Sequence, residues 1–255
     1  MKRHLFLLAE LVRRDLALRY AGSFGGIAWA VLHPLILCGL YSLVFSVIVR
    51  VPPPPDFGGG YTPFLLAGLI PWLGFSDALV RGASSVTDQA HIVKKLSFPV
   101  GLLVVSSIAG ALLLQTAAIG VLVVVFSVLG VGKIHFLPLL GAYLLEILVL
   151  AGPVFALAAG SVLFRDLSQL IGPLLTVLFY LTPVLYPEAL VPDALRGGLV
   201  LNPARDVVAL FRAGLIGTEA PPVGRLLVWG GALAALAFLG RAFFERSRRV
   251  FVDVL

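Results

Sequence analysis

Few residues in this chain have the types and spacing that chemistry needs. The sequence contains no glycine-rich phosphate loop ending in lysine and serine or threonine, so it offers no nucleotide-binding site of that kind. Its four histidines, His4, His33, His91 and His135, lie far apart and form no zinc-binding motif. The single cysteine, Cys38, cannot form an internal disulfide or a thiolate metal cluster. We therefore predict no catalytic residue and no metal site in this chain.

Two acidic residues, Asp77 and Glu146, lie within or beside long apolar segments. Asp77 precedes Arg81 by four residues, the spacing at which a helix brings an acid and a base together as an ion pair. Glu146 has no charge partner at helical spacing, and an unpaired carboxylate within lipid is costly. We therefore expect Glu146 to be protonated, paired with another helix or next to water. The two acids form no cluster that could hold Mg²⁺ at a lipid diphosphate, which disfavours an enzyme of lipid-linked sugars.

The composition is that of a membrane protein. Of 255 residues, 60% are apolar and 13% are charged, and the mean hydropathy is +1.05, whereas a soluble domain has about 45–50% apolar and about 25% charged residues. Because about 20 apolar residues in a helix span a bilayer, the charge-free segments predict an all-α polytopic membrane protein with one transmembrane domain over residues 1–255. The six predicted spans cover 27–49, 63–81, 101–129, 137–163, 167–186 and 226–244. The last has the shortest charge-free segment, and it crosses only if Arg241 extends to the interface.

The first twenty residues predict an amphipathic helix rather than a secretory signal. Apolar residues recur at helical spacing, but Glu10, Arg13, Arg14 and Asp15 interrupt the run that a signal peptide needs. A helix over residues 2–20 with this pattern fits the membrane interface, where its cations would lie near anionic lipids. An ordinary solvated helix beside the membrane is the alternative.

The distribution of lysine and arginine predicts the orientation. With the N-terminus inside, thirteen of the nineteen cations lie on the inner side of the six spans. An even number of spans also places both ends on one side, and both ends are basic. We expect both termini in the cytoplasm.

The segment 84–97, between the second and third spans, predicts a short cytoplasmic helix whose charges follow the order that the helix dipole favours. Its possible caps are Ser85 and Thr87, and its charged residues are Asp88, Lys94 and Lys95. Such a helix is either a simple hairpin connection or a docking element for a soluble partner.

The outer segment 187–225 contains five prolines, yet residues 207–216 are apolar enough to contact lipid. We expect a short amphipathic helix that re-enters the outer leaflet, with an ordinary surface loop as the alternative.

Aromatic residues gather in the first and fifth predicted spans. They are Trp29, Tyr41, Phe45, Phe179, Tyr180 and Tyr186. Anchoring at the membrane interface accounts for Trp29, Tyr41 and Tyr186. Phe179 and Tyr180 lie deeper, where aromatic faces could also stack on sugar rings.

Seven short motifs occur in a recognisable order along these elements. They are Arg19–Trp29, His33-Pro34, Gly68–Ser76, Lys94–Pro99, Phe164–Leu167, Thr182–Tyr186 and Leu201–Pro203. Together they resemble the transmembrane (permease) subunits of type 2 ATP-binding-cassette exporters of cell-surface polysaccharide, which carry O-antigen, capsule or teichoic acid. The resemblance covers essentially the whole chain.

The resemblance implies a homodimer in the bacterial inner membrane that works with two copies of a separate ATPase, which holds the ATP and Mg²⁺. It implies an interface helix at 2–20 and a coupling helix that contacts the ATPase through Thr87, Asp88, His91, Lys94 and Lys95. The first and fifth spans, with the six aromatic residues, would line the path of a polysaccharide linked to a polyprenyl diphosphate lipid. It implies no nucleic acid partner and no cofactor in this chain.

Arg13, Arg14 and Arg19 are candidates for binding the lipid diphosphate, because guanidinium groups pair with phosphate in bidentate fashion. The alternative is that they only anchor a basic helix on the inner side. A type 2 exporter of a drug, a haem precursor or another lipid is the main rival interpretation of the whole chain.

Overall fold

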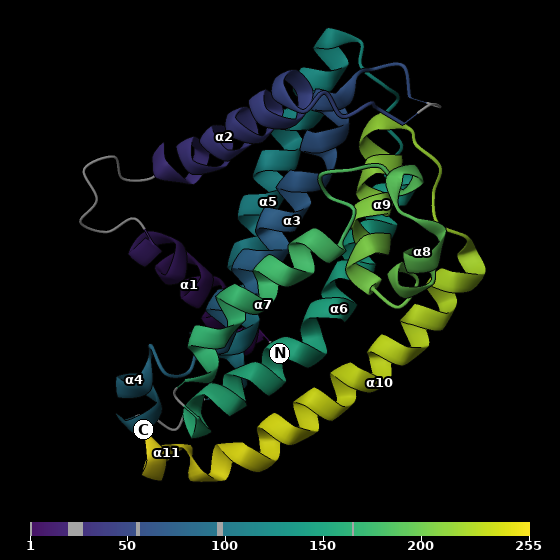
Figure 1. Ribbon diagram of the computed structural model, residues 1–255. Helices are drawn as coiled ribbons and strands as arrows, with labels where there is room; N and C mark the ends of the chain where they lie inside the picture. Colours follow the sequence, from purple (N-terminus) through teal and green to yellow (C-terminus); the bar gives the residue numbers. More distant parts are fainter. Residues whose placement is uncertain (1, 20–27, 55–56, 96–98, 165) are drawn as a thin grey trace.

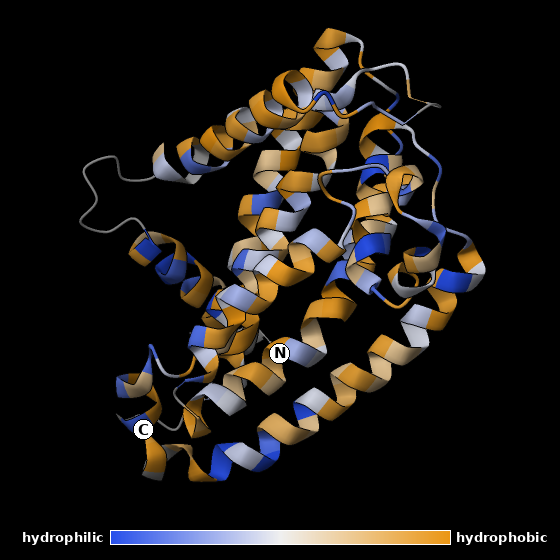
Figure 2. Ribbon diagram, viewed as in Figure 1, coloured by the Kyte–Doolittle hydropathy of each residue, from blue (hydrophilic) through white to orange (hydrophobic). Residues whose placement is uncertain are grey.

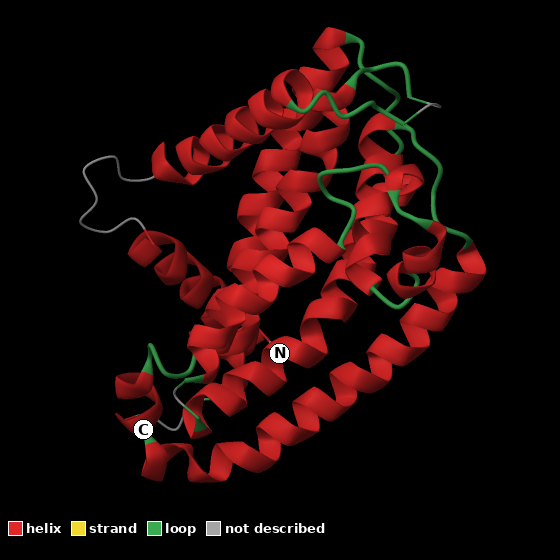
Figure 3. Ribbon diagram, in the orientation of Figure 1, coloured by secondary structure: helices red, strands yellow, loops and turns green. Residues whose placement is uncertain are grey.

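The computed structural model describes residues 2–19, 28–54, 57–95, 99–164 and 166–255 (Figure 1). Within these residues the secondary structure is entirely helical (Figure 3). The four longest helices are α3 (Tyr61–Ser84), α5 (Gly101–Leu129), α6 (Phe136–Leu163) and α10 (Val223–Ser247). The others are α1 (Lys2–Arg19), α2 (Ala28–Ser42) with the π-helix η1 (Leu43–Ile48), α4 (Ala90–Lys95), α7 (Leu167–Leu181), η2 (Glu188–Leu190), α8 (Asp193–Leu199), α9 (Pro203–Ile216), η3 (Arg248–Val250) and α11 (Phe251–Val254).

Four of the predicted spans coincide with helices long and apolar enough to cross a membrane, namely α3, α5, α6 and α10. The last helix, α10, is long although it was predicted from the shortest charge-free segment. Its arginines lie within the helix and do not interrupt it. The apolar helices at the first and fifth predicted spans are shorter, Leu32–Ile48 and Leu167–Leu181. Six crossings thus remain a prediction.

The helix of the fifth predicted span ends at Leu181 instead of continuing to residue 186. Pro183 disfavours helical geometry at the residue before it, and Thr182 accordingly has extended backbone angles, φ −100° and ψ 131°. The Thr182 hydroxyl donates to the Leu178 carbonyl at 2.7 Å. Residues 182–186 therefore form a turn that leads into the outer segment.

The core of the bundle lies between α3, α5, α6 and α9, and α10 packs along α6 (Figure 1). α1 packs on α5, whereas α2 and α7 both pack on α3. Most of the residues on the outer sides of α2, α7 and α10 are apolar and exposed (Figure 2). Apolar outer faces of this kind suit contact with lipid tails or with a second apolar protein surface.

α6 and α10 approach closely at two glycines. A Cβ atom on Gly240 would overlap the carbonyl oxygen of Gly152, and a Cβ atom on Gly152 would lie 2.7 Å from the Leu236 carbonyl oxygen. Small residues at such positions let helix backbones come together in membranes. Gly152 and Gly240 therefore define how closely the last helix packs.

α9 is a helix in the outer segment, as expected, so the surface-loop alternative is wrong, but its residues 207–216 are mostly buried within the protein. Asn202 caps it by accepting a hydrogen bond from the Ala204 backbone N–H at 3.0 Å, and Pro203 occupies its first turn. The helix ends at Gly217, which has a φ of 73°. Most of its residues are buried against α6 and α3. Its entry into the outer leaflet remains a prediction.

Candidate functional site

The predicted coupling helix is shorter than expected. α3 continues to Ser84, a turn follows over 85–89, and α4 covers only Ala90–Lys95, while residues 96 and 97 lie outside the described part of the chain. The predicted caps are wrong, because the Ser85 hydroxyl donates back to the Gly82 carbonyl at 2.7 Å and the Thr87 hydroxyl to the Ser84 carbonyl at 2.9 Å.

The residues of this segment divide into an anchored and an exposed set. Val86 and Val93 are buried and fix the segment on the bundle. Asp88, His91 and Lys94 are exposed, and Asp88 accepts a hydrogen bond from the Ser84 hydroxyl at 2.7 Å. Thr87 is half-buried; Lys95 ends α4, and its side chain lies outside the described residues. The result is a short, firmly attached projection with a charged outer face.

An ion-pair cluster attaches α1 to α3. The Arg19 guanidinium contacts Asp15 of its own helix at 2.7 Å and Asp77 of α3 at 2.6 Å. Asp77 also pairs with Arg81 at 2.7 Å, which confirms the ion pair predicted from their spacing. The Arg19 side chain is only 2% exposed. Because Arg19 is paired with two carboxylates, its guanidinium is used in holding α1 against α3.

Arg13 and Arg14, which the sequence groups with Arg19, are exposed rather than buried. The Arg13 side chain is 81% exposed and pairs with Glu10 at 3.1 Å. Arg14 is exposed as well. The structure therefore separates the three candidates into two surface cations and one buried cation.

Four of the six predicted aromatic residues lie together between α2, α3 and α7. The ring of Phe179 is 5.9 Å from that of Tyr41 and 5.4 Å from that of Tyr180, and Tyr41 is 6.1 Å from Phe45. Phe179 is buried, whereas Tyr180 is 58% exposed. Only Tyr180 of this pair therefore presents most of its ring to the outside.

The remaining aromatic residues have different neighbours. Trp29 is exposed on α2, away from this cluster, and the Tyr186 hydroxyl donates to the Tyr180 carbonyl at 2.7 Å. The cluster also contains Trp72 of α3, whose ring is 5.5 Å from Phe179. Sequence reasoning missed Trp72 as a partner, although its spacing of three residues from Phe75 places both rings on one helix face.

Glu146 is paired across helices, one of the three outcomes expected for it. It is fully buried, and its Oε2 accepts a hydrogen bond from Gln115 Nε2 of α5 at 2.8 Å. The second carboxyl oxygen of Glu146, Oε1, and the amide oxygen of Gln115, Oε1, are buried without a partner. This pair joins α5 to α6 at the level of the bundle core.

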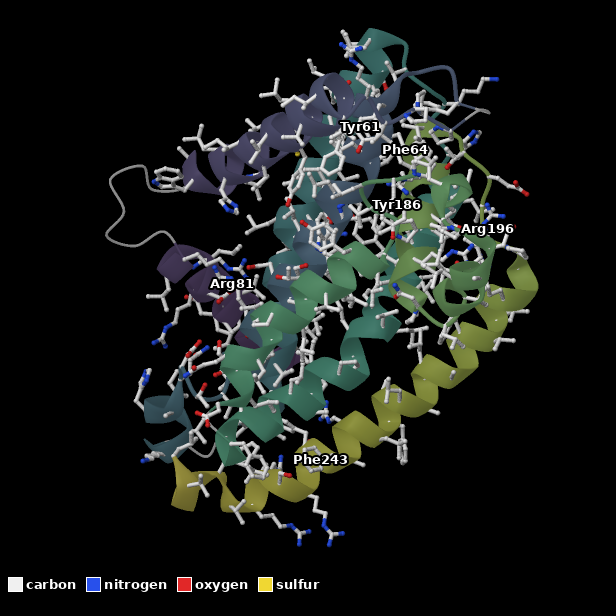
Figure 4. The ribbon with its side chains drawn as sticks, viewed as in Figure 1. Tyr61, Phe64, Arg81, Tyr186, Arg196 and Phe243 are labelled. Atoms are coloured by element: carbon white, nitrogen blue, oxygen red, sulfur yellow. The ribbon has the colours of Figure 1, made fainter. Side chains whose placement is uncertain are left out.

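Sequence reasoning missed a buried arginine on α9. Arg212 donates to the carbonyl oxygens of Phe64 (3.2 Å), Pro183 (2.6 Å) and Val184 (2.6 Å). Its guanidinium also lies 3.6 Å from the centre of the Phe64 ring, near the end of α3 where Figure 4 labels Tyr61 and Phe64. Gly68 leaves the space that this group occupies. Arg212 thus fixes the turn after α7 against α3 and α9.

A second polar set joins α9 to its neighbours. Asp206 accepts a hydrogen bond from Trp229 Nε1 at 3.0 Å and pairs with Arg225 at 2.7 Å, both from α10. Arg205 donates to Glu188 of η2. Burial raises the pKa of the Asp206 carboxyl, and the Arg225 and Arg205 charges oppose that shift. A charge within an otherwise apolar helix is the signal that could have identified both sets.

Comparison with known proteins adds family information to this geometry. Residues 7–216 match the family described as ABC-2 type transporter. The chain is 29% identical to an O-antigen export system permease protein of Myxococcus xanthus, over 97% of this chain and 94% of the relative. It is 26% identical to a Klebsiella pneumoniae protein of the same description, over 98% and 95%. It is 24% identical to the polysialic acid transport protein of Escherichia coli, over 79% and 78%. The family match spans most of the chain, and the protein therefore belongs to the ABC-2 type transporter family of membrane proteins.

Proposed function

We propose that this chain is the membrane-spanning subunit of an exporter that moves a lipid-linked polysaccharide, such as O-antigen, across the bacterial inner membrane. Two copies of the chain form the translocation unit, and two copies of a separate ATPase supply the energy by hydrolysing ATP with Mg²⁺. The observation that carries this proposal is near-full-length similarity to O-antigen export permeases. The lack of a phosphate loop in the sequence supports an ATPase on another chain.

In the proposed mechanism the ATPase contacts the projection formed by the turn and α4, through Thr87, Asp88, His91, Lys94 and Lys95. Closure of the two ATPases on ATP would displace α4 and move α3, from which it extends. The burial of Val86 and Val93 supports transmission of this motion, because it attaches the projection to the bundle. Both termini lie in the cytoplasm in this arrangement, and the contact between α4 and the C-terminal α11 supports it.

The polysaccharide path would run between the two copies along α2 and α7. Aromatic rings suit such a path, because their faces stack on the apolar faces of many different sugars. Of the six predicted lining residues, Trp29, Tyr41, Phe45, Tyr180 and Tyr186 are proposed to line the path, and Phe179 to support them from behind. The exposure of Trp29 and Tyr180 supports direct contact, whereas burial of Phe179 supports a role in holding Tyr180 in position.

The function is tested in a strain that lacks its O-antigen permease and produces this chain with an ABC ATPase subunit. We expect the wild-type chain to bind the ATPase and to restore surface polysaccharide. Asp88→Lys reverses a charge on the exposed face of the projection and should lower export by about tenfold, which corresponds to roughly 1.4 kcal/mol of lost coupling. Export is measured as surface polysaccharide per membrane-inserted chain.

Glu219→Lys is the matched control, because it reverses an acidic residue in the segment between α9 and α10, away from the projection. Equal export by Asp88→Lys and wild type would remove Asp88 from the ATPase contact. Failure of the wild-type chain to export polysaccharide while it stimulates the ATPase with another substrate would contradict the proposed substrate.

Arg13 and Arg14 are proposed to contact the lipid diphosphate, and Arg19 to support them by anchoring α1. The exposure of the first two side chains supports this division. Replacing Arg13 and Arg14 together by glutamine should lower export by at least about tenfold, because losing even one charge-assisted hydrogen bond to phosphate costs roughly 1.5 kcal/mol.

The control for this variant replaces Arg246 and Arg249, two exposed cations near the other end of the chain, by glutamine. It removes the same charge from the inner side without affecting α1. If both double variants export alike, the arginines of α1 serve only in orientation, and their proposed contact with phosphate is wrong.

A further inference from the structure

A pocket of about 580 Å³ opens between α1, α2, α3 and α5, on the side of α3 where Figure 4 labels Arg81. Its volume falls within the range of roughly 300–1,000 Å³ that is typical of small-molecule sites. Its wall is mainly apolar, with Trp29, Ile70 and Leu73 among the lining residues. The polar side chains on the wall are Arg19, His33, Ser76, Asp77, Arg81 and Gln115.

The amide of Gln115 has a hydrogen-bond acceptor that nothing in the described part of the protein satisfies. Gln115 is 3% exposed, and its Nε2 is occupied by Glu146 at 2.8 Å. This bond fixes the amide so that Oε1 lies against Gly74, another residue of the pocket wall. Gln115 Oε1 has no hydrogen-bond partner, and neither does the Ser76 hydroxyl. Because buried polar groups normally have partners, a ligand hydroxyl group that reached this part of the wall would satisfy either atom.

Of the two arginines on the pocket wall, Arg81 has hydrogen-bond donors that are not in use within the described residues, whereas each guanidinium nitrogen of Arg19 is hydrogen-bonded. Arg19 is enclosed by Asp15 and Asp77 and is 2% exposed. The Arg81 side chain is 40% exposed, and its hydrogen bond to Asp77 uses only Nε. Within the described residues its two terminal nitrogens have no hydrogen-bond partner. These nitrogens form the fork that binds phosphate oxygens in pairs.

From these groups we infer that the pocket binds the headgroup of a lipid that carries both a phosphate and hydroxyl groups. Arg81 would hold the phosphate, Gln115 Oε1 and Ser76 would bind the hydroxyls, and the apolar wall would contact the start of the lipid chain. The ligand comes either from the bulk membrane, as phosphatidylglycerol, or from the export substrate, as a glycosylated polyprenyl phosphate. The second source rests on the proposed function, but the first does not.

The test is native mass spectrometry of the purified, delipidated full-length chain. It is titrated separately with phosphatidylglycerol, phosphatidylcholine, a glycosylated polyprenyl diphosphate and inorganic phosphate. We expect saturable binding of phosphatidylglycerol or of the glycolipid, and weaker binding of phosphatidylcholine, which lacks hydroxyl groups. Binding of phosphatidylglycerol alone assigns the bulk-membrane source and leaves the export proposal to its own test.

Three variants connect this binding to the pocket. Arg81→Gln should weaken the favoured lipid by about tenfold, the effect of losing one charge-assisted hydrogen bond. Ser76→Ala and Gln115→Leu should each reduce the preference for a hydroxyl-bearing headgroup over phosphatidylcholine, and Arg81 should retain the part that comes from the negative charge of the lipid. Because Gln115→Leu also leaves Glu146 without its partner, Ser76→Ala tests the same preference with less risk to folding.

Matched controls are Arg196→Gln, which removes an exposed arginine that also pairs with an acid on its own helix, and Thr116→Val, which changes the exposed neighbour of Gln115. Both should bind lipid as the wild type does. The inference is overturned if Arg81→Gln and Arg196→Gln behave alike, if phosphatidylcholine binds as tightly as the hydroxyl-bearing lipids, or if inorganic phosphate is the sole species that binds.

Discussion

Arg212→Met is expected to destabilise the protein by roughly 3 kcal/mol, because buried carbonyl groups left without a donor cost about 1–3 kcal/mol each. The carbonyls of Pro183 and Val184, in the turn after α7, lose this donor, whereas Phe64 lies within α3, where its carbonyl also accepts the helical hydrogen bond. Loss of the buried charge itself offsets part of this cost. Thermal unfolding in detergent measures the effect, and the midpoint should fall by about 6–12 °C. Export should fall with it, since the turn after α7 loses its attachment.

Arg212→Lys separates charge from shape. Lysine keeps the charge and three donors but lacks the planar fork, so we expect a midpoint between those of wild type and Arg212→Met. Arg249→Met, at an exposed arginine near the other end of the chain, should leave the midpoint nearly unchanged. A midpoint for Arg212→Met equal to that of wild type would mean that the turn after α7 is held by other contacts.

Gly240→Val should have a comparable effect through packing alone. The new side chain would overlap the carbonyl group of Gly152, whose Cα would lie 3.0 Å from the added Cβ atom. A backbone atom cannot move aside as a flexible side chain can, so α10 must shift away from α6. Forced overpacking costs about 1–3 kcal/mol or more. We expect a lower unfolding midpoint and less full-length chain in the membrane.

The same helix provides the control. Gly231 lies on α10 with open space around the position of a Cβ atom. Gly231→Val therefore adds the same side chain with no overlap, and it should leave the midpoint at or slightly above that of wild type. Equal midpoints for Gly240→Val and Gly231→Val would show that the close approach of α6 and α10 contributes nothing to stability.

Much of the fold follows from the hydropathy pattern. The limits of α5, 101–129, agree with the predicted span, α6 begins one residue earlier than predicted, and α3 and α10 extend two or three residues beyond their predicted spans at each end. α5 is the best predicted because it lies within one long charge-free segment, whereas α3, α6 and α10 contain charged residues such as Asp77, Glu146 and Arg241. α7 shows the reverse, because a charge-free segment continues to residue 187 while Pro183 ends the helix at Leu181.

The polar contacts between helices were less predictable. The Asp77–Arg81 pair follows from spacing within one helix, but the contact of Asp77 with Arg19, 58 residues away in sequence, depends on how α1 packs. In the same way, sequence spacing cannot identify the carbonyl groups around Arg212, which come from α3 and from the turn after α7. Periodicity identifies helix faces, but it does not identify which faces meet.

In the candidate sites too, the positions of residues were predictable from the sequence, but their packing was not. The position of the projection with Asp88 and Lys94 was predictable from its charges, whereas its length was not, because hydroxyl groups at its start bond backward to α3. The three arginines of α1 looked equivalent in sequence, yet packing buries one and exposes the other two. Similarly, four of the six aromatic residues meet because α2 and α7 both pack on α3.

In the proposed function, the C-terminal segment gives α4 a second connection to the bundle, through which a displacement of α4 can be transmitted. α11 contacts both α4 and α6 (Figure 1), and its buried Phe251 meets Phe244 of α10 edge to face, with ring centres 5.5 Å apart. A push on α4 thus reaches α3 through the covalent chain and α10 through these rings. A bulky fusion partner placed after Leu255 would add drag at this junction, so labels for measuring the motion belong elsewhere on the chain.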